Sequence, residues 1–353
     1  MEGLDMIWQE YGLDQLQQGL SELFPGNAFS LRQVFSQIMQ GDVLGAIRDV
    51  LNAMLGDMRG QLAGMRNVLL WLVLLGLVSA LMSHFMEIFD KHQIADISFY
   101  FMYLLLTAVL LACFGQTVQV ASDTMENILV FIRLLVPTYL LAVGVASGTA
   151  TAGASYQLVV LLIYGVEQLL VGGLLPFIYS YVLLAVVNGV WIEEKLALLM
   201  ELLEKAIKAV LKATIGVVTG ISVFQSVITP VIDTAKTSTI QKVVSAIPGI
   251  GGAADSMASL VIGSAVVIKN SIGVVLLILL VSMCMAPLLQ ILLTACCLKL
   301  AAAVMGIVSD KRITTCTNKV GEGSMMLLRV TGTALLLFLI CIAVVAVSTN
   351  HGL

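Results

Sequence analysis

The stretch Ile-Pro-Gly-Ile-Gly-Gly-Ala-Ala-Asp-Ser, residues 247–256, opens the region that decides the fold of this 353-residue chain. Small residues follow it as far as Lys269, and the next 29 residues, Asn270 to Leu298, carry no charge. At about 1.5 Å per residue, a helix of that length exceeds the roughly 30 Å core of a bilayer. The segment before it is too polar and glycine-rich to face lipid, which cannot satisfy an irregular backbone. We therefore predict a protein-lined or water-lined, partly re-entrant element at residues 233–269, beside a membrane span.

The composition of the whole chain supports a membrane protein. Hydrophobic residues make up 59% of the chain and charged residues 11%, whereas soluble proteins carry roughly 25% charged residues. The mean hydropathy is +1.02. The 18 Lys and Arg residues are scattered along the chain, which argues against a nucleic-acid-binding surface. We expect an all-α, polytopic integral membrane protein.

The order of apolar and polar segments predicts two regions. Residues 1–66 are polar enough to lie outside the membrane, and residues 43–59 repeat apolar side chains at helical spacing, which predicts an extramembrane amphipathic helix. Residues 67–353 form the membrane domain. The predicted spans are residues 67–86, 97–120, 128–147, 156–175, 176–192, 213–232, 270–298 and 330–347. Asp123 and Glu126 are expected to form the loop that closes the second span.

The count of spans depends on residues 156–192. Gly172-Gly173 and Pro176 divide them into two short spans, giving eight in all. One long, kinked helix is the alternative, giving seven. The charged residues of 193–212 recur at helical spacing opposite an apolar side, which predicts an amphipathic helix lying in the plane of the interface.

Basic residues set the expected orientation. Residues 193–212 contain four lysines, the predicted loop 299–329 contains five Lys and Arg residues, and the tail after Arg329 contains none. Because loops rich in Lys and Arg remain in the cytoplasm, we expect both basic segments there and the C-terminus outside. The element at 233–269 then faces outward.

Glu167 is the most expensive residue in a predicted span, because an ionised carboxylate in a bilayer costs several kcal/mol unless it is paired or hydrated. Arg133, in the first turns of the preceding span, lies at a depth from which its long side chain can reach Glu167. The two are candidates for an intramembrane polar pair. A structural ion pair, a pore or substrate-path residue and a protonated, inert carboxyl group remain open for Glu167.

Enzyme, metal and cofactor motifs are missing from the sequence. The glycines after Pro248 lack the Gly-Lys-Ser/Thr of a phosphate loop, and there is no HExxH, GxSxG or intramembrane Gly-Asp. His84, Glu87, Asp90 and His92 have the types of metal ligands, but polar residues at the end of a span are the ordinary explanation. We expect no catalytic residue, no metal and no cofactor. A stand-alone small-solute permease and a membrane subunit of a larger assembly both remain open.

Two runs carry a family resemblance. Ser245-Ala246-Ile247-Pro248-Gly249-Ile250-Gly251-Gly252, continuing to Ala254-Asp255-Ser256, and Val267-Ile268-Lys269-Asn270-Ser271-Ile272-Gly273 resemble the signature region of the stage III sporulation protein AE family. Lys299-Leu300-Ala301-Ala302-Ala303 is similar as well. The resemblance in span layout extends from about residue 60 to the end of the chain.

The resemblance implies a role in endospore formation. Family members lie in the mother-cell membrane that surrounds the forespore and belong to a secretion-like complex, which reaches a forespore membrane protein and is needed for late forespore gene expression. They usually begin with a signal sequence, whose removal would favour eight spans. We therefore expect a channel or scaffold subunit, and its assembly into a homo-oligomer remains open. Its partner-contact or re-entrant residues would be Pro248, Gly249, Gly251, Gly252, Asp255, Lys269 and Asn270.

Overall fold

The computed structural model describes residues 92–147, 149–191, 195–244, 251–307 and 309–348, together with scattered positions between residues 36 and 78. Within these residues the chain is helical apart from short turns, and no strand occurs. Most of the predicted first span, residues 67–86, lies outside the described residues, as do Pro248 and Gly249. The all-α prediction is thus confirmed for the described part of the chain.

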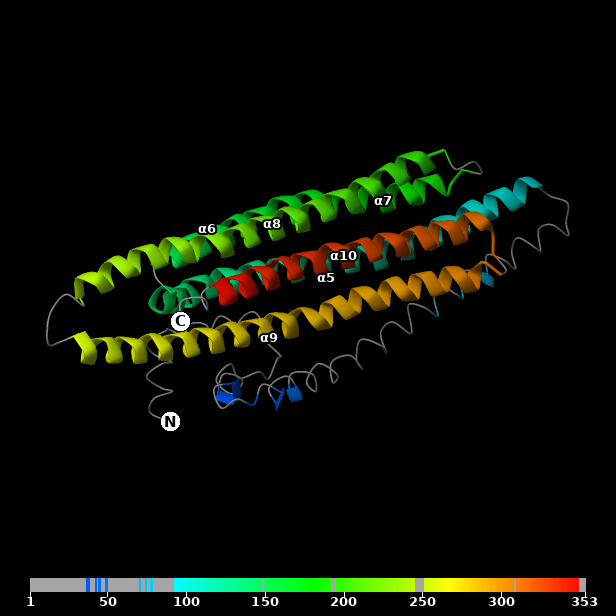
Figure 1. Cartoon of the computed structure of the whole chain (residues 1–353). Coiled ribbons are helices and arrows are strands. Elements are labelled where there is room, and N and C mark those ends of the chain that lie inside the picture. Colours follow the sequence, from blue (N-terminus) through cyan, green and yellow to red (C-terminus); the bar gives the residue numbers. More distant parts are fainter. Residues whose placement is uncertain are drawn as a thin grey trace.

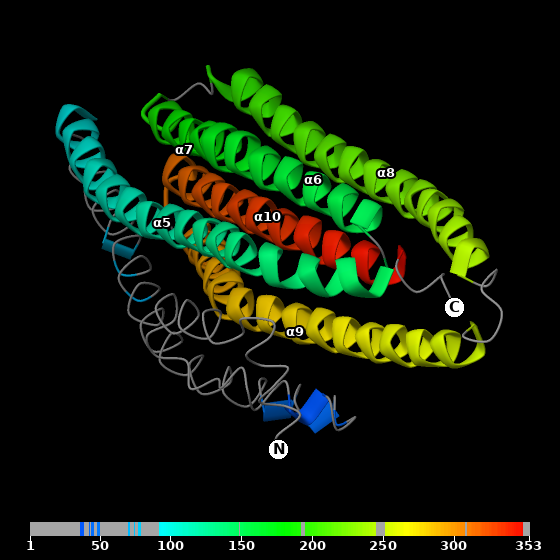
Figure 2. The same cartoon turned by 90° about the vertical axis from the view of Figure 1, so that its left-hand side faces the viewer.

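The described helices run side by side in one elongated bundle, as Figures 1 and 2 show. α10 is its central helix, because it packs against α5, α6, α7, α8 and α9. The elements are α5 (His92–Ser147), α6 (Thr149–Gly165), the π-helix η1 (Val166–Leu174), α7 (Leu175–Asn188), α8 (Ala197–Val244), α9 (Gly251–Met305) and α10 (Lys311–Ser348).

Two glycines let α10 approach its neighbours closely. A Cβ atom added to Gly323 would lie 2.3 Å from Val182 Cγ2 on α7 and 3.3 Å from the Phe114 ring on α5. One added to Gly321 would lie 3.0 Å from the side chain of Lys299 on α9. Small residues at helix contacts are typical of membrane bundles, where packing replaces the hydrophobic effect as the driving force. The Gly-Glu-Gly run at residues 321–323 therefore fixes α10 against three helices.

Four described helices are long and apolar enough to cross a membrane. They contain the segments Phe99–Leu135, Ser155–Asn188, Asn270–Met305 and Lys311–Ala343. Each segment has 33 to 37 residues, more than the roughly 20 that a bilayer core requires. The bundle is therefore longer than the core is thick, and the charged end of a helix can extend beyond it.

The predicted loop between the second and third spans is wrong. Asp123 and Glu126 were expected to end a span, but both lie inside α5, which is continuous from His92 to Ser147. The segment between them contains neither glycine nor proline, so nothing in the backbone interrupts the helix. Charge alone was a poor indicator of a helix end here.

Residues 156–192 follow the alternative of one long helix rather than two spans. α6, η1 and α7 form a continuous run, and the stretch with Gly172 and Gly173 adopts π-helical geometry instead of a turn. Leu175, which follows it, donates its backbone N–H to the carbonyl of Leu170, five residues earlier. Pro176 is the second residue of α7, so its missing N–H group falls where the π-helical hydrogen bonds give way to α-helical ones.

The polar segments near both basic blocks are also more helical than predicted. α8 joins the amphipathic residues 197–212 to the expected span 213–232 and continues to Val244. The predicted loop 299–329 shrinks to residues 306–310, since α9 ends at Met305 and α10 begins at Lys311. The run Lys299 to Ala303 is rich in good helix formers, which accounts for the extension of α9.

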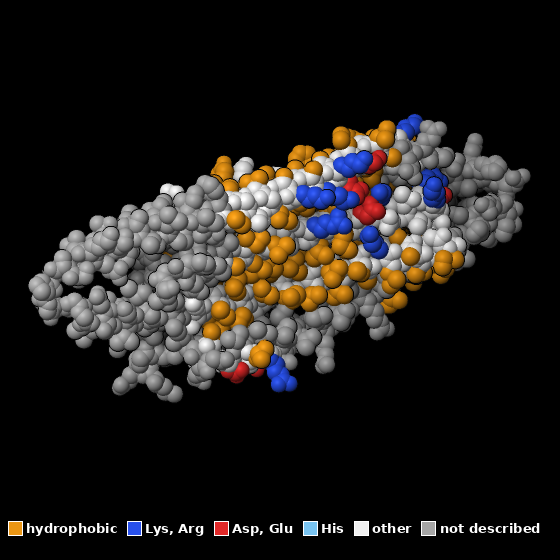
Figure 3. Space-filling model, viewed as in Figure 1, with side chains coloured by type: hydrophobic (Ala, Val, Ile, Leu, Met, Phe, Trp, Pro, Cys, Tyr) orange, Lys and Arg blue, Asp and Glu red, His pale blue; other side chains and the backbone are white. Residues whose placement is uncertain are grey.

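The two basic segments lie at the same end of the bundle. The α7–α8 connection and the α9–α10 connection meet there, at the right in Figure 1. Lysine and arginine side chains cluster near that end in Figure 3. We call this the basic end, and its cationic residues are Lys195, Lys205, Lys208, Lys212, Lys299, Lys311, Arg312 and Lys319. The ends of α8 and α10 and the start of α9 lie at the opposite end.

Candidate functional site

Arg133 and Glu167 form an ion pair between α5 and η1. Arg133 Nη2 donates to Glu167 Oε2 at 2.6 Å. The structure thus brings together the two residues that the sequence singled out as candidates. Their side chains are 51% and 54% exposed, so the pair lies on the outside of the bundle rather than in its core.

The surroundings of this pair are apolar. Leu134 beside Arg133, and Tyr164 and Leu169 on either side of Glu167, are all exposed large side chains. Glu167 stands in the first turn of the π-helix η1, a geometry that occurs often at functional sites. An exposed charged pair within an apolar surface is expensive in lipid. It therefore requires water or protein around it.

The exposed face of α5 also carries polar residues that our reading of the sequence missed as a group. Gln116, Gln119, Asp123 and Glu126 are all exposed and precede Arg133 on the same helix. Gln119 Nε2 donates to Asp123 Oδ1 at 2.7 Å. Their spacing of three and four residues places them on one face, which is a signal present in the sequence. It was lost because two of these residues were assigned to a loop.

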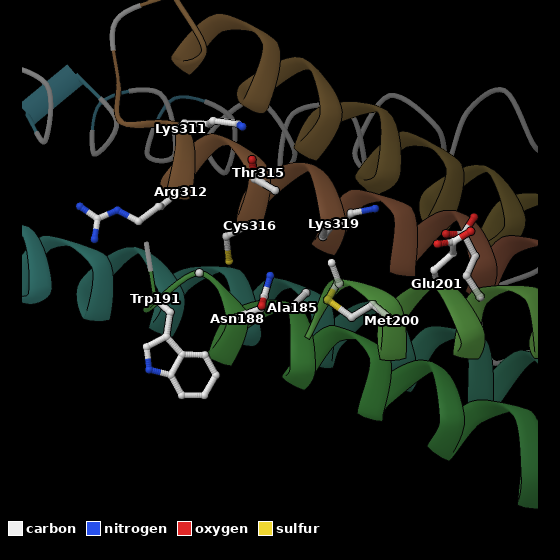
Figure 4. Close-up of a pocket in the computed structure, with 13 residues that line it drawn as sticks. Ala185, Asn188, Trp191, Met200, Glu201, Lys311, Arg312, Thr315, Cys316 and Lys319 are labelled. Atoms are coloured by element: carbon white, nitrogen blue, oxygen red, sulfur yellow. The ribbon is translucent and has the colours of Figure 1, made fainter. Parts of the chain in front are cut away.

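A second polar region is a cavity of about 340 Å³ at the basic end. Figure 4 shows Lys319 extending from α10 toward the part of α8 that carries Glu201, with Cys316 and Asn188 pointing toward each other. The cavity is lined by Ala185, Asn188, Gly189, Trp191, Ala197, Met200, Glu201, Glu204, Lys311, Arg312, Thr315, Cys316 and Lys319.

Most charges of this cavity are matched by neighbours. Glu201 pairs with Lys205 at 2.6 Å, and this hydrogen bond lowers the pKa of Glu201. Glu204 pairs with Lys208 on the same helix. Such i,i+4 pairs support an exposed helix. The cavity is therefore a polar opening whose charges are largely satisfied within the chain.

Glu322 lies on α10 about one turn from Lys319, which lines the cavity. Its Oε2 accepts hydrogen bonds from the Tyr181 hydroxyl at 2.8 Å and from Lys319 Nζ at 2.9 Å. Its Oε1 accepts a bond from Asn318 Nδ2 at 3.3 Å. Tyr181 is fully buried, so the carboxylate links α10 to the core of α7. A charge in a helix that is long and apolar enough to span a membrane is satisfied here by the protein itself.

Polar contacts hold the end of α7 in place at the basic end. Asn188 Oδ1 accepts the backbone N–H of Leu196 at 2.9 Å, and the Tyr103 hydroxyl donates to the carbonyl of Val186 at 2.6 Å. The Arg312 guanidinium lies 3.5 Å from the centre of the Phe99 ring, within cation–π range. α5, α7 and α10 are thus tied together at the basic end.

The predicted partner-contact residues fall on α9 and on the segment before it. Gly251, Gly252 and Asp255 lie in the first turns of α9, and Lys269 and Asn270 lie farther along the same helix. α9 has no break after Gly251. Pro248 and Gly249 fall in residues 245–250, which lie outside the described residues.

No metal site is visible in the described part of the chain, where no three His, Cys, Asp or Glu residues come together. The cysteines are free thiols.

Comparisons with known proteins agree with one another. The model of the family described as stage III sporulation protein AE matches residues 29–349. The chain is also 21% identical to the stage III sporulation protein AE of Bacillus subtilis (strain 168) over 316 residues, which cover 89% of this chain and 79% of that protein. No solved structure matches the chain.

Proposed function

The chain belongs to the stage III sporulation protein AE family, and from this premise we propose that it is a membrane channel or scaffold subunit of the secretion-like complex that links mother cell and forespore. Its role would support late gene expression in the forespore. It would span the mother-cell membrane around the forespore several times, with the basic end in the cytoplasm. Its partners would be the other subunits of that complex and, through them, a forespore membrane protein.

One observation carries this proposal, namely the position of the Arg133–Glu167 pair. Both side chains are about half exposed on the outside of helices that are otherwise apolar enough to span a membrane. A charged side chain that faces lipid in a membrane helix is costly unless it is paired or hydrated. A surface that includes such a pair is better suited to contact with other subunits than to lipid. This favours a subunit of an assembly over a solitary permease.

The number of spans remains part of the proposal. The continuous helix from Thr149 to Asn188 supports seven spans over eight when the other predicted spans are retained. However, α5 joins two of the predicted spans into one helix, which lowers the count again. Cysteine probes at Ser30, Ser256 and Ile307, labelled in intact cells with a reagent that cannot cross membranes, would determine the side of each segment. We expect Ile307, in the turn at the basic end, to be protected.

The glycine-rich segment between α8 and α9 would contact partner subunits. The end of α8 and the start of α9, which flank this segment in the chain, lie at the end of the bundle opposite to the basic end, and this supports an outward-facing position. Replacing Gly251 and Gly252 with valine should block assembly of the complex while leaving the protein in the membrane. Normal spore yield in that double variant would rule out this role.

Glu167 and Arg133 discriminate between the two classes of function. In a subunit held by a structural pair, Glu167→Gln should reduce spore yield mildly and Arg133→Leu more severely, because Leu leaves the carboxylate without its cation. In a proton-coupled permease, Glu167→Gln should abolish function by itself. Spore yield and co-purification of partner subunits, measured in the same strains, separate these outcomes. Loss of spores with the complex intact in Glu167→Gln would favour the permease.

A further inference from the structure

The exposed face of α5 changes character halfway along the helix. Its first half presents apolar residues, among them Phe101, Leu105, Ala108 and Ala112. Its second half continues the same face with polar residues. We call them the polar stripe, and they are Gln116, Gln119, Asp123, Glu126 and Arg133. From Gln116 to Arg133 the polar stripe covers 18 residues, or about 25 Å of helix, which approaches the thickness of a bilayer core.

The polar stripe has a net negative charge. Arg133 is neutralised by Glu167 at 2.6 Å. Asp123 accepts a hydrogen bond from Gln119, and among the described residues neither Asp123 nor Glu126 forms a salt bridge with a basic side chain. The carboxylates of Asp123 and Glu126 therefore need a counter-ion or water on this exposed face.

Contacts with neighbouring helices show where the polar stripe lies along the length of the bundle. Near its first end, Phe114 lies against Gly323 of α10, and beyond its second end Tyr139 lies against Gly273 of α9. Between these two levels α9 is part of the uncharged run from Asn270 to Leu298. The polar stripe therefore runs alongside the most apolar part of the bundle.

The continuous helix formed by α6, η1 and α7 places the polar stripe at the same level of the bundle. Among residues 149–192 Glu167 is the single charged residue, and it is the residue that pairs with the polar stripe. Exposed aromatic and aliphatic side chains surround it on this run. The polar stripe is thus a polar line within an apolar belt.

Lipid and dry protein are both poor surroundings for this face. Carboxylates facing lipid at this depth are costly, and burying them against dry protein is costly unless each meets a cation. A second copy of the same face would bring carboxylates against carboxylates. Water satisfies all of these groups without strain in the helix.

We propose that the polar stripe of α5 lines a hydrated path across the membrane and that Asp123 and Glu126 make this path attractive to small hydrated cations and cationic groups. This rests on the proposed function, because a single helix face needs neighbouring subunits to complete the wall. Intramembrane ionisable groups commonly mark such paths, and a lining of one sign raises the local concentration of opposite charge.

Cysteine accessibility in membranes isolated from broken sporulating cells, where the reagent reaches both faces, tests the path. Single probes at Gln116→Cys and Gln119→Cys keep both carboxylates, in a cysteine-free background that still forms spores. Ile307→Cys in the exposed turn between α9 and α10 is the positive control. Phe177→Cys is the matched control, because Phe177 is an exposed apolar residue of α7 a little over one turn from Val182, which meets Phe114 and Gly323.

We expect a water-soluble methanethiosulfonate reagent to modify both probes on the polar stripe while Phe177→Cys stays unmodified. Modification of Phe177→Cys at the same rate would place this level of the bundle in bulk water and overturn the path. Protection of the stripe probes while Ile307→Cys reacts would indicate a dry contact and overturn it as well.

The charge preference has its own comparison. With rates normalised to Ile307→Cys, a trimethylammonium reagent should modify the stripe probes about tenfold faster than a sulfonate reagent. The double change Asp123→Asn and Glu126→Gln should remove that difference. Its persistence would overturn the role of these carboxylates. Normal sporulation without this protein would instead refute the proposed function, whichever probes react.

Discussion

Two regions of the bundle hold charged residues within helices long enough to span a membrane, and they hold them differently. At the basic end, Glu322 is enclosed by partners from the chain itself, since Tyr181, Asn318 and Lys319 all donate to its carboxylate. On α5, the polar stripe turns outward, and Arg133 and Glu167 remain about half exposed even though they are paired.

The difference separates charged residues that stabilise the fold from charged residues that need water or another molecule as a partner. The contacts of Glu322 are complete in one chain, so its contribution belongs to stability. The carboxylates of the polar stripe have no basic partner among the described residues, so under the proposed function their contribution belongs to an assembly in the membrane. Changes in the first region should therefore alter the isolated protein, and changes in the second should alter it only in its complex.

The largest effect on the isolated protein is expected at Gly323. Gly323→Val places new atoms where a Cβ would already lie 2.3 Å from Val182, and overpacking of this kind costs about 1–3 kcal/mol or more. Thermal unfolding in detergent should show a clear loss of stability. Gly332→Val is the matched control, because a Cβ there meets nothing within 4 Å on the same helix. Equal losses in both variants would contradict the close packing of α10.

The pair of Arg133 and Glu167 should show the opposite behaviour, with a large effect on spore yield and a small one on the stability of the isolated protein. Reversal of the pair, Arg133→Glu with Glu167→Arg, should restore much of the spore yield that Arg133→Glu alone removes, because the single change opposes two carboxylates. The unfolding temperature of the isolated protein should change little in the single variant, since the exposed pair contributes about 0–1 kcal/mol. A large loss of stability in detergent would show that the pair belongs to the fold.

Tyr181→Phe should destabilise the isolated protein less than Gly323→Val does. It removes one hydrogen bond to Glu322 and leaves a partly buried carboxylate less satisfied, which costs about 1–3 kcal/mol. Tyr179→Phe changes an exposed residue of the same helix and serves as the control. Chemical denaturation of the detergent-solubilised chain measures both. An unfolding midpoint that is unchanged in Tyr181→Phe would remove Glu322 from the residues that hold the fold.

The smallest effect is expected at the exposed pair Glu201–Lys205. Lys205 lowers the pKa of Glu201, so any stabilisation is present above the ordinary carboxyl pKa and is lost as the pH falls through the lowered value. Lys205→Ala should leave the unfolding temperature unchanged within error at neutral pH and abolish this weak pH dependence. A measurable loss at neutral pH would mean that the pair supports the wall of the cavity.

The sequence predicted the class of the fold better than its divisions. An uncharged run as long as Asn270 to Leu298 has few solutions other than a spanning helix, so its assignment needed no tertiary information. Asp123 and Glu126 were misassigned because charge was taken as the mark of a loop. In the structure the segment between the two predicted spans contains no glycine or proline, and α5 continues through it.

The pairing of Arg133 with Glu167 could be anticipated because few charges are available at that depth. The contacts of Glu322 could not, since Tyr181 lies 141 residues away and the predicted loop placed Glu322 outside any helix. The close approach at Gly323 depends on which side chains face it from α7 and α5. A glycine in the sequence indicates that another helix can approach closely, but it does not indicate which residue approaches.

The π-helical segment η1 has a consequence for how this family can vary. A π turn holds more residues than an α turn, so η1 sets the angle at which Glu167 leaves the helix relative to α7. Removing one residue from it would turn the preceding part by about 100° and carry the carboxylate away from Arg133 without altering either side chain. Homologues should therefore tolerate many substitutions in this helix, whereas a single insertion or deletion between Glu167 and Pro176 should be selected against.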